Sequence, residues 1–379
     1  MTARILGWCG YFLVGVCVVA LPLMAQEPTP HKTYFVYVVC EGADKIAVVK
    51  YGPNGATLDH TLRTGRMPGA DLSGPHGIVV SPDRQFYYVT LAHGRPFGQA
   101  LKYRTKDDAV VGQVTLGYFP ATVDITPDGN FIYEVNFNLH GDMIPSSVSV
   151  VATDEMVEAA RIPTCVMPHG SRLNPDGSKQ YSACMMDDML VEIDTGKFRV
   201  SRHFLLSKGK EAGAQGPPPK DQHATANASC SPTWAQPSPD GKSVYVACNK
   251  SDEIVEVVVD SWSLKRRLPA GTGVYNLAIS KDGKLLATNK RAQSVSVFDL
   301  SSGRELARLP TKRKIPDGVV ISPDSLFAFV AVEGIGSEPG TVEVIDLHSL
   351  KTVATVDVPE QAVGIDFWKA EEASTGSGN

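Results

Sequence analysis

The chain has 379 residues, of which 43% are hydrophobic and 20% are charged. This composition is ordinary for a globular protein and provides enough apolar surface for a packed core. The formal net charge of -5 gives no drive toward nucleic acid or anionic lipid, so neither is an expected partner. The 34 glycines and 26 prolines indicate many turns.

The N-terminal segment differs in character from the rest. Arg4 precedes an almost wholly apolar stretch from Ile5 to Met24, and residues 26–32 are polar. This pattern predicts an export signal in residues 1–25, a linker over residues 26–32, and a periplasmic or secreted protein. The apolar stretch is long for a cleaved peptide, so an uncleaved membrane anchor at this segment is the alternative.

A degenerate repeat fills most of the remaining chain, and its turn gives the phase. The copies begin at Pro82, Pro127, Pro175, Pro239, Lys281 and Pro323, with spacings of 45, 48, 64, 42 and 42 residues. Pro followed by Asp and Gly predicts a tight hairpin between the first two strands of each unit. The long interval contains residues 208–229, which lack apolar periodicity and are expected to form a surface loop.

The two ends of the repeat region complete each other. Residues 33–64 supply a second, third and fourth strand without a first, whereas residues 363–369 resemble a first strand alone. Joining them gives a seventh unit and leaves no open sheet edge. We therefore predict an all-β fold over residues 33–369: a seven-bladed β-propeller of four-stranded antiparallel blades, followed by a disordered tail over residues 370–379.

The repeat strings resemble a known family. GVVISPDSLFAFVAV, SPDGKSVYVACNKSDEIVEVVVD and the Tyr88-Val89-Thr90 string are similar to the YVTN-type, or YncE-like, propeller repeat. The resemblance covers residues 33–369 and implies the propeller fold. The haem propeller of cytochrome-type nitrite reductases and propeller lactonases share this architecture, so the resemblance does not choose a function.

The repeat phase places side chains around the mouth of the central channel. Counting six residues back from each turn gives His76, Ala121, His169, Thr233, Tyr275 and Asp317. Loops after the second strands add His93, His140, Asn289-Lys290-Arg291 and Glu333, and the insertion adds His223. Five of the nine histidines are thus expected on one face, and this clustering is the main functional signal.

Four of these histidines form a candidate metal site: His76, His93, His140 and His169. Converging neutral imidazoles suit copper, zinc, iron or a haem, and the nearby methionines Met167, Met185 and Met186 favour copper. The structural alternative is that such histidines hydrogen-bond carbonyl groups of the neighbouring blade.

The remaining side chains at the mouth suggest a pocket for an organic ligand: His223, Thr233, Trp234, Tyr275, Arg291, Asp317 and Glu333. Glu333, Asp317 and Glu41 could also hold Ca²⁺ or supply a base in a lactonase-like site, although acidic residues are common in such loops. The mature chain lacks HExxH, CxxCH, GxSxG and phosphate-loop strings.

The cysteines predict two disulfides. Cys165 and Cys184 flank the turn at Pro175, and Cys230 and Cys248 flank the turn at Pro239, so each pair lies nearly opposite in a hairpin. Each bridge is expected to join the loop before the first strand of a blade to the end of its second strand. Cys40 has no partner and is expected to be a buried apolar residue.

Taken together, the sequence predicts an exported, monomeric propeller whose histidine-rich channel mouth binds a metal ion or a small ligand. An oxidoreductase that binds haem or copper is the first alternative. A lactonase-like hydrolase and a protein-interaction scaffold are the others, and the residues do not decide whether the chain is an enzyme.

Overall fold

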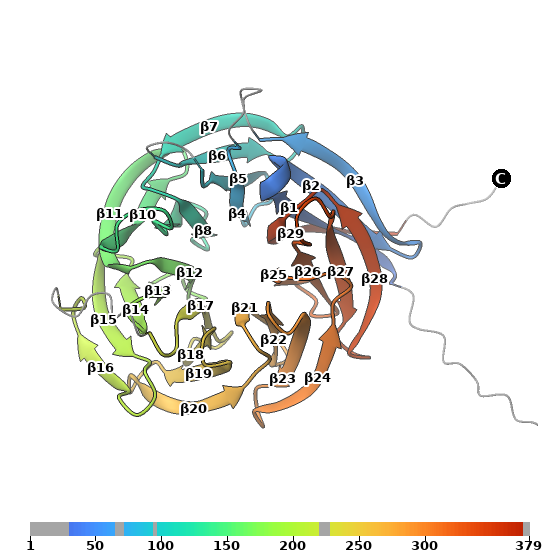
Figure 1. Ribbon diagram of the computed structural model, residues 1–379. Helices are drawn as coiled ribbons and strands as arrows, with labels where there is room; N and C mark the ends of the chain where they lie inside the picture. Colours follow the sequence, from blue (N-terminus) through green and yellow to red (C-terminus); the bar gives the residue numbers. More distant parts are fainter. Residues whose placement is uncertain (1–29, 65–71, 94–96, 220–227, 374–379) are drawn as a thin grey trace, which may run out of the picture.

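A computed structural model describes residues 30–64, 72–93, 97–219 and 228–373. Seven antiparallel sheets form a closed ring around a central channel (Figure 1). The predicted export signal lies outside the described residues, as do His223 and most of the predicted tail. Among the described residues, no helix is long and apolar enough to cross a membrane.

Each blade is given from its innermost to its outermost strand. Blade 1 contains β29 (Ala362–Glu372), β1 (Lys32–Cys40), β2 (Lys45–Gly52) and β3 (Gly55–Arg63), with the short 3-10 helix η1 (Glu41–Ala43) after β1. Blade 2 contains β4 (Pro75–Val80), β5 (Phe86–Leu91), β6 (Gln99–Arg104) and β7 (Ala109–Thr115). Blade 3 contains β8 (Pro120–Ile125), β9 (Phe131–Asn136), β10 (Pro145–Ala152) and β11 (Val157–Val166). Blade 4 contains β12 (Pro168–Leu173), β13 (Lys179–Cys184), β14 (Met189–Asp194), β15 (Arg199–Leu205) and β16 (Ala212–Gln215).

The last three blades are the most regular. Blade 5 contains β17 (Pro232–Pro237), β18 (Ser243–Cys248), β19 (Glu253–Val258) and β20 (Ser263–Pro269). Blade 6 contains β21 (Val274–Ile279), β22 (Lys284–Asn289), β23 (Ser294–Asp299) and β24 (Arg304–Pro310). Blade 7 contains β25 (Pro316–Ile321), β26 (Phe327–Val332), β27 (Gly340–Asp346) and β28 (Lys351–Val358).

The predicted ring closure is confirmed. The C-terminal β29 pairs antiparallel with the N-terminal β1, for example Val36 opposite Phe367 and Val38 opposite Ile365. The two ends of the chain thus share blade 1, and the ring has no gap between its first and last strands (Figure 1). This closure covers the inner edge of β1, which would otherwise be free to pair with another chain.

The insertion differs in part from the predicted loop. Within residues 208–229, β16 pairs with β15 through Arg202–Gln215 and His203–Ala214, which gives blade 4 a fifth strand. All four residues of β16 are exposed. The strand pairs with β15 through its backbone and has no apolar alternation by which the sequence could reveal it.

The turn between the first two strands has the predicted chemistry. Residues in the glycine position of the turn adopt left-handed backbone angles, as at Gly129 (φ 78°), Gly241 (φ 69°) and Arg84 (φ 61°). The residue before the proline supplies a hydroxyl in most copies. Ser238 Oγ, for example, donates to Asp240 Oδ1 at 2.6 Å and accepts from the backbone N–H of Ser243.

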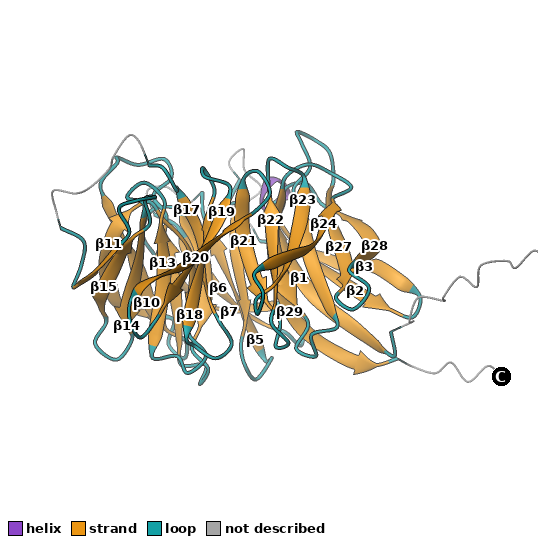
Figure 2. Ribbon diagram, turned by 90° about the horizontal axis from the view of Figure 1, so that it is seen from below, coloured by secondary structure: helices purple, strands orange, loops and turns teal. Residues whose placement is uncertain are grey.

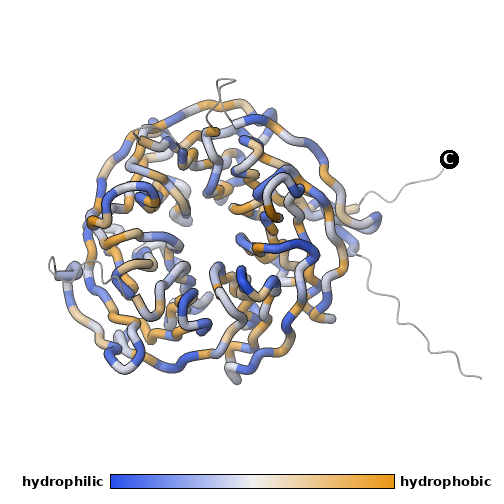
Figure 3. Tube along the Cα trace, viewed as in Figure 1, coloured by the Kyte–Doolittle hydropathy of each residue, from blue (hydrophilic) through white to orange (hydrophobic). Residues whose placement is uncertain are grey.

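The core lies between neighbouring blades. Seven clusters of buried hydrophobic residues each combine side chains from two adjacent blades, including the contact between blades 7 and 1. Hydrophobic segments accordingly run through every blade, and the loops are more hydrophilic (Figure 3). Because each blade buries apolar area against both neighbours, the ring is the stable unit.

Both predicted disulfides are present, Cys165–Cys184 and Cys230–Cys248. Cys165 is placed differently from the prediction, because it lies in β11, the outermost strand of blade 3, and its bridge therefore joins blades 3 and 4. Cys40 is fully buried and unpaired, and burial raises the pKa of its thiol to about 12.

Candidate functional site

The channel mouth is built from two positions repeated in every blade. The first is the second residue of the innermost strand: His76, Ala121, His169, Thr233, Tyr275, Asp317 and Val363. The second is the residue directly after the second strand: Glu41, Ala92, Phe137, Met185, Asn249, Lys290 and Glu333. Both positions lie on one face of the ring, because the first strand begins where the second strand ends (Figure 2).

In each blade, a backbone hydrogen bond links the second position to the residue just before the innermost strand. The N–H group after the second strand donates to the carbonyl of the residue before the first strand, as from Lys290 to Gly273 and from Glu333 to Ile315. The accepting residue has positive φ in all seven blades: Gly74, Phe119, Met167, Ser231, Gly273, Ile315 and Gln361. Left-handed angles at bulky residues such as Phe119 and Ile315 are costly, and the surrounding ring enforces them.

The glycines of the two Pro-His-Gly strings have a packing role. A Cβ atom on Gly77 would lie 2.2 Å from the carbonyl oxygen of Ala121 in the next blade, and one on Gly170 would lie 2.3 Å from that of Thr233. Glycine is therefore needed where adjacent innermost strands approach most closely. The histidine between proline and glycine faces the channel.

A small cavity of about 30 Å³ lies on the channel axis below the mouth. Its lining includes His76, His169, Tyr275, Asn276 and Asp317. Two polar atoms of these side chains, His76 Nδ1 and Asn276 Oδ1, are buried without a hydrogen-bond partner. A volume of this size holds about two water molecules or a small polar group.

Glu41 and two histidines form one side of the mouth. Glu41 Oε1 lies 2.6 Å from His93 Nε2, and Glu41 Oε2 lies 3.8 Å from His76 Nε2. Burial alone would raise the pKa of Glu41, but His76 and His93 together lower it below its usual value. Glu41 is therefore an ionised, buried carboxylate that orients both imidazoles.

Lys290 and two carboxylates form the opposite side. Lys290 Nζ lies 2.5 Å from Asp317 Oδ2, 2.9 Å from Glu333 Oε1 and 3.7 Å from the centre of the Tyr275 ring. Burial opposes the charge on Lys290, but these neighbours raise its pKa well above the usual value. Burial and the nearby Asp317 raise the pKa of Glu333 to about 7, although Lys290 counteracts part of this shift.

His169 is held by hydrogen bonds at both ring nitrogens. Nδ1 lies 2.8 Å from the carbonyl oxygen of Thr233, which accepts a hydrogen bond, and Nε2 lies 2.9 Å from the Tyr275 hydroxyl. The carbonyl fixes the proton on Nδ1, so Nε2 accepts from Tyr275. Burial lowers the pKa of His169 to about 4, so the ring stays neutral. Metal binding at His169 would require breaking one of these bonds.

The other predicted site residues differ in their surroundings. Thr233 is fully buried and donates to the carbonyl of Tyr275 at 2.9 Å, and Trp234 lines the cavity with the Arg172 guanidinium 4.4 Å above its ring. His140 is exposed and its ring centre lies 6.2 Å from that of His93.

Arg291 does not line the cavity, in contrast to the prediction. Its exposed guanidinium instead donates to Asn249 and Asp252 of blade 5. Lys290 occupies the position at the mouth instead, and Asn276 adds an acceptor that the sequence analysis did not single out. Both could be found from the repeat phase: Lys290 directly follows a second strand, and Asn276 occupies the strand position that is glycine at Gly77 and Gly170.

Haem does not fit the site described here. The cavity has room for about two water molecules, and His169 has no free ring nitrogen. Among the described residues, no group of three or more His, Cys, Asp or Glu side chains is placed to hold a metal ion. A metal held by Glu41, His76 and His93 would require opening the hydrogen bond between Glu41 and His93.

Comparisons with known proteins identify the fold alone. No model of a known protein family and no curated protein match the chain. A solved structure of Kuenenia stuttgartiensis hydrazine synthase is 21% identical over 75% of this chain and 80% of that chain, with a TM-score of 0.58. A functionally unknown protein from Desulfotomaculum acetoxidans is 16% identical over 88% and 98%, with a TM-score of 0.66. The chain is thus a seven-bladed β-propeller by its own topology and by its structural neighbours.

Proposed function

We propose that this chain is an exported propeller of the YVTN type that binds a small polar ligand at its channel mouth. Two disulfides favour an oxidising compartment, which agrees with the apolar N-terminal segment. The Pro-Asp-Gly turns and the Tyr-Val-Thr string support the family resemblance, although a fold carries no activity by itself.

One observation carries the ligand-binding proposal: two unpartnered polar atoms, His76 Nδ1 and Asn276 Oδ1, lie at the same small cavity. Buried polar atoms are nearly always paired, so atoms left free around one cavity favour a bound polar group. Asp317 lines this cavity, and Glu41 lies 3.8 Å from His76, which also lines it. This arrangement supports recognition of a ligand more directly than a purely structural role.

A metal ion is the second candidate. The two oxygens of Glu41 face His93 and His76, and a carboxylate with two imidazoles is a donor set for copper, zinc or iron. The metal would replace the hydrogen bond between Glu41 and His93, so its affinity would depend on how easily the His93 side chain moves.

Native mass spectrometry and metal analysis of protein purified from the periplasm test both candidates. We expect a bound small molecule or metal in the wild type, and its loss in a His76→Ala variant. A His348→Ala variant is the matched control, because His348 is an exposed residue in the turn between β27 and β28, at the opposite face. Wild-type protein that carries no ligand and binds none of the metals would contradict the proposal and favour a scaffold.

A further inference from the structure

The free polar atoms at the cavity are acceptors of hydrogen bonds. Asn276 is 5% exposed, and its unpartnered Oδ1 can only accept. His76 Nε2 lies 3.8 Å from Glu41 Oε2, and its other ring nitrogen, Nδ1, is buried without a partner and accepts a hydrogen bond in the tautomer that carries the proton on Nε2. The Tyr275 hydroxyl donates to His169, so its oxygen is also left as an acceptor.

Several of the donors around the cavity already have acceptors. Lys290 donates to Asp317 and Glu333. The Arg172 guanidinium also lines the cavity, but it lies over Trp234 and donates to the carbonyl oxygens of Ser171 and Val123. A ligand that pairs with the free acceptors must therefore bring donors.

Charge selects among donor-rich ligands. Three acidic side chains lie at the mouth: Asp317 lines the cavity, Glu333 contacts Lys290 beside it, and Glu41 lies near His76 and His93. Lys290 supplies one positive charge and contacts two of these groups, Asp317 and Glu333. Arg172, which also lines the cavity, carries a second positive charge, and Asp124 and Asp366 lie close enough to interact with it. The mouth therefore favours a cation over a neutral or anionic group.

Lys290 shows how the channel mouth accommodates an ammonium group. The Lys290 ammonium lies over the Tyr275 ring and contacts two carboxylates, which is a favourable environment for a primary ammonium group. The neighbouring cavity of about 30 Å³ shares Tyr275 and Asp317 with this environment and adds Asn276 and His76 as acceptors.

We infer that the cavity takes the primary ammonium group of an organic amine, whose alkyl chain extends toward the channel mouth. This inference rests on the proposed function and names the chemical class of its ligand. The same ammonium group occurs in a small free amine and in a lysine side chain of a partner protein.

Isothermal titration calorimetry tests the inference with matched probes: n-butylammonium, n-butanol, butyrate, Zn²⁺, and the capped peptide acetyl-Gly-Lys-Gly-amide. We expect saturable binding of n-butylammonium and no binding of n-butanol or butyrate at the same concentration. Saturable binding of the peptide with an affinity at least equal to that of n-butylammonium would support the inference and identify a lysine side chain as the source. Weaker binding of the peptide would support a free amine.

Two variants test whether the amine binds in the cavity. Asp317→Asn removes one charge with little change in shape, and Asn276→Ala removes the buried acceptor; each should weaken amine binding roughly tenfold or more. The control is Asp107→Asn, since Asp107 pairs with Arg104 at an exposed turn. Thermal unfolding checks that each variant is folded, and Asn276→Ala decides the question if Asp317→Asn does not fold.

The outcomes separate the inference from the proposed function. Binding of butyrate or Zn²⁺ that depends on His76, with no binding of n-butylammonium, would overturn the amine and leave the mouth as a ligand site. Amine binding that both cavity variants leave unchanged would overturn the inference by placing the amine elsewhere. Absence of binding by every probe, together with purified protein that carries no ligand, would overturn both.

Discussion

Each charged side chain at the channel mouth is held by a residue from another blade. Lys290 of blade 6 contacts Glu333 of blade 7, 43 residues away, and Tyr275 of blade 6 contacts His169 of blade 4, 106 residues away. These pairs lie in a region of low exposure, where an unpaired charge would be costly. The ring therefore fixes the protonation states of the mouth as well as its shape.

Glu333 gives a prediction that depends on pH. Its folded-state pKa of about 7 lies above the usual value of 4.5, so the folded state holds this proton more strongly than the unfolded state. The associated stability is present below pH 4.5 and is lost as the pH rises toward 7. At 1.36 kcal/mol per unit of pKa, the full effect is about 3 kcal/mol.

A Glu333→Gln variant removes this titration. Scanning calorimetry should show that the difference in Tm, variant minus wild type, becomes more positive between pH 5 and pH 8. Glu338→Gln is the matched control, because Glu338 is an exposed residue in the same loop of blade 7. A difference in Tm that stays constant over this pH range would show that Glu333 is ionised in both states.

The repeat phase predicts where a side chain lies but not what it bonds to. It places His76, His169 and Asp317 on one ring, because each lies six residues before its turn. It does not predict that Tyr275 and Thr233 use both nitrogens of His169, since these contacts depend on neighbouring blades. It also does not predict that Arg291 bonds to Asn249 and Asp252 of blade 5, whereas the adjacent Lys290 contacts Asp317 and Glu333 of blade 7.

At the level of strands, the local turn chemistry is strong enough to read from sequence. Pro-Asp-Gly turns and paired cysteines are short-range features, and the structure contains both. The fifth strand of blade 4 could not be read in this way, because β16 buries no side chain and its pairing is set by the backbone of β15. The same insertion depends on a buried aspartate at its base.

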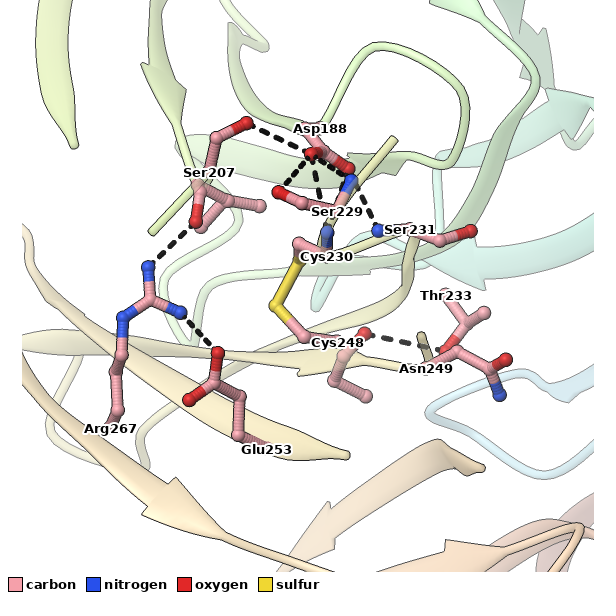
Figure 4. Close-up of a disulfide and its surroundings, with 12 residues drawn as sticks. Asp188, Ser207, Ser229, Cys230, Ser231, Thr233, Cys248, Asn249, Glu253 and Arg267 are labelled. Carbon is pink, nitrogen blue, oxygen red and sulfur yellow. Dashed lines mark hydrogen bonds and ion pairs between the residues drawn. A yellow bond between two sulfur atoms is a disulfide. The ribbon is translucent and has the colours of Figure 1, made fainter. Parts of the chain in front are cut away.

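Asp188 holds the chain where the insertion returns to the ring (Figure 4). Its carboxylate accepts hydrogen bonds from Ser207 Oγ before the insertion and from the backbone N–H groups of Ser229, Cys230 and Ser231 after it. Burial would raise the pKa of Asp188, but these donors lower it below the usual value. The carboxylate and the Cys230–Cys248 bridge therefore fix the same segment.

An Asp188→Asn variant should loosen this segment while the disulfide stays intact. The asparagine amide has one oxygen that can accept from these donors, and its NH₂ group would face the remaining donors. We therefore expect roughly tenfold faster hydrogen exchange at the backbone amides of Cys230 and Ser231. Hydrogen-exchange mass spectrometry measures the change, with Asp107→Asn as the control. Unchanged exchange would mean that the disulfide alone holds the segment.

At the scale of the whole molecule, closure of the ring depends on one strand. β29 pairs with β1, and Asp366 Oδ2 of β29 accepts the backbone N–H of Val80 in blade 2 at 2.7 Å. Removing β29 exposes the edge of β1 and the apolar side chains that β29 covers in blade 1. This closure was predictable because the two chain ends carry complementary parts of one repeat.

Deletion of residues 362–379 tests the closure. Light scattering should show association of the truncated chain, and calorimetry should show loss of the cooperative transition. A chain that ends at Ala373, which keeps β29 intact, is the control. A truncated chain that remains monomeric with an unchanged Tm would show that six complete blades with an open edge are enough for a stable, monomeric protein.

Histidine-selective NMR shows directly whether the channel mouth binds a ligand. Protein labelled with ¹⁵N at histidine is titrated with n-butylammonium and, separately, with Zn²⁺. A ligand at the mouth should shift the His76 signals with at least one probe, whereas the signals of His60 and His348, which lie away from the mouth, should stay unchanged. His76 signals that remain unchanged with both probes, or shifts of equal size at all three histidines, would contradict a ligand site at the channel mouth.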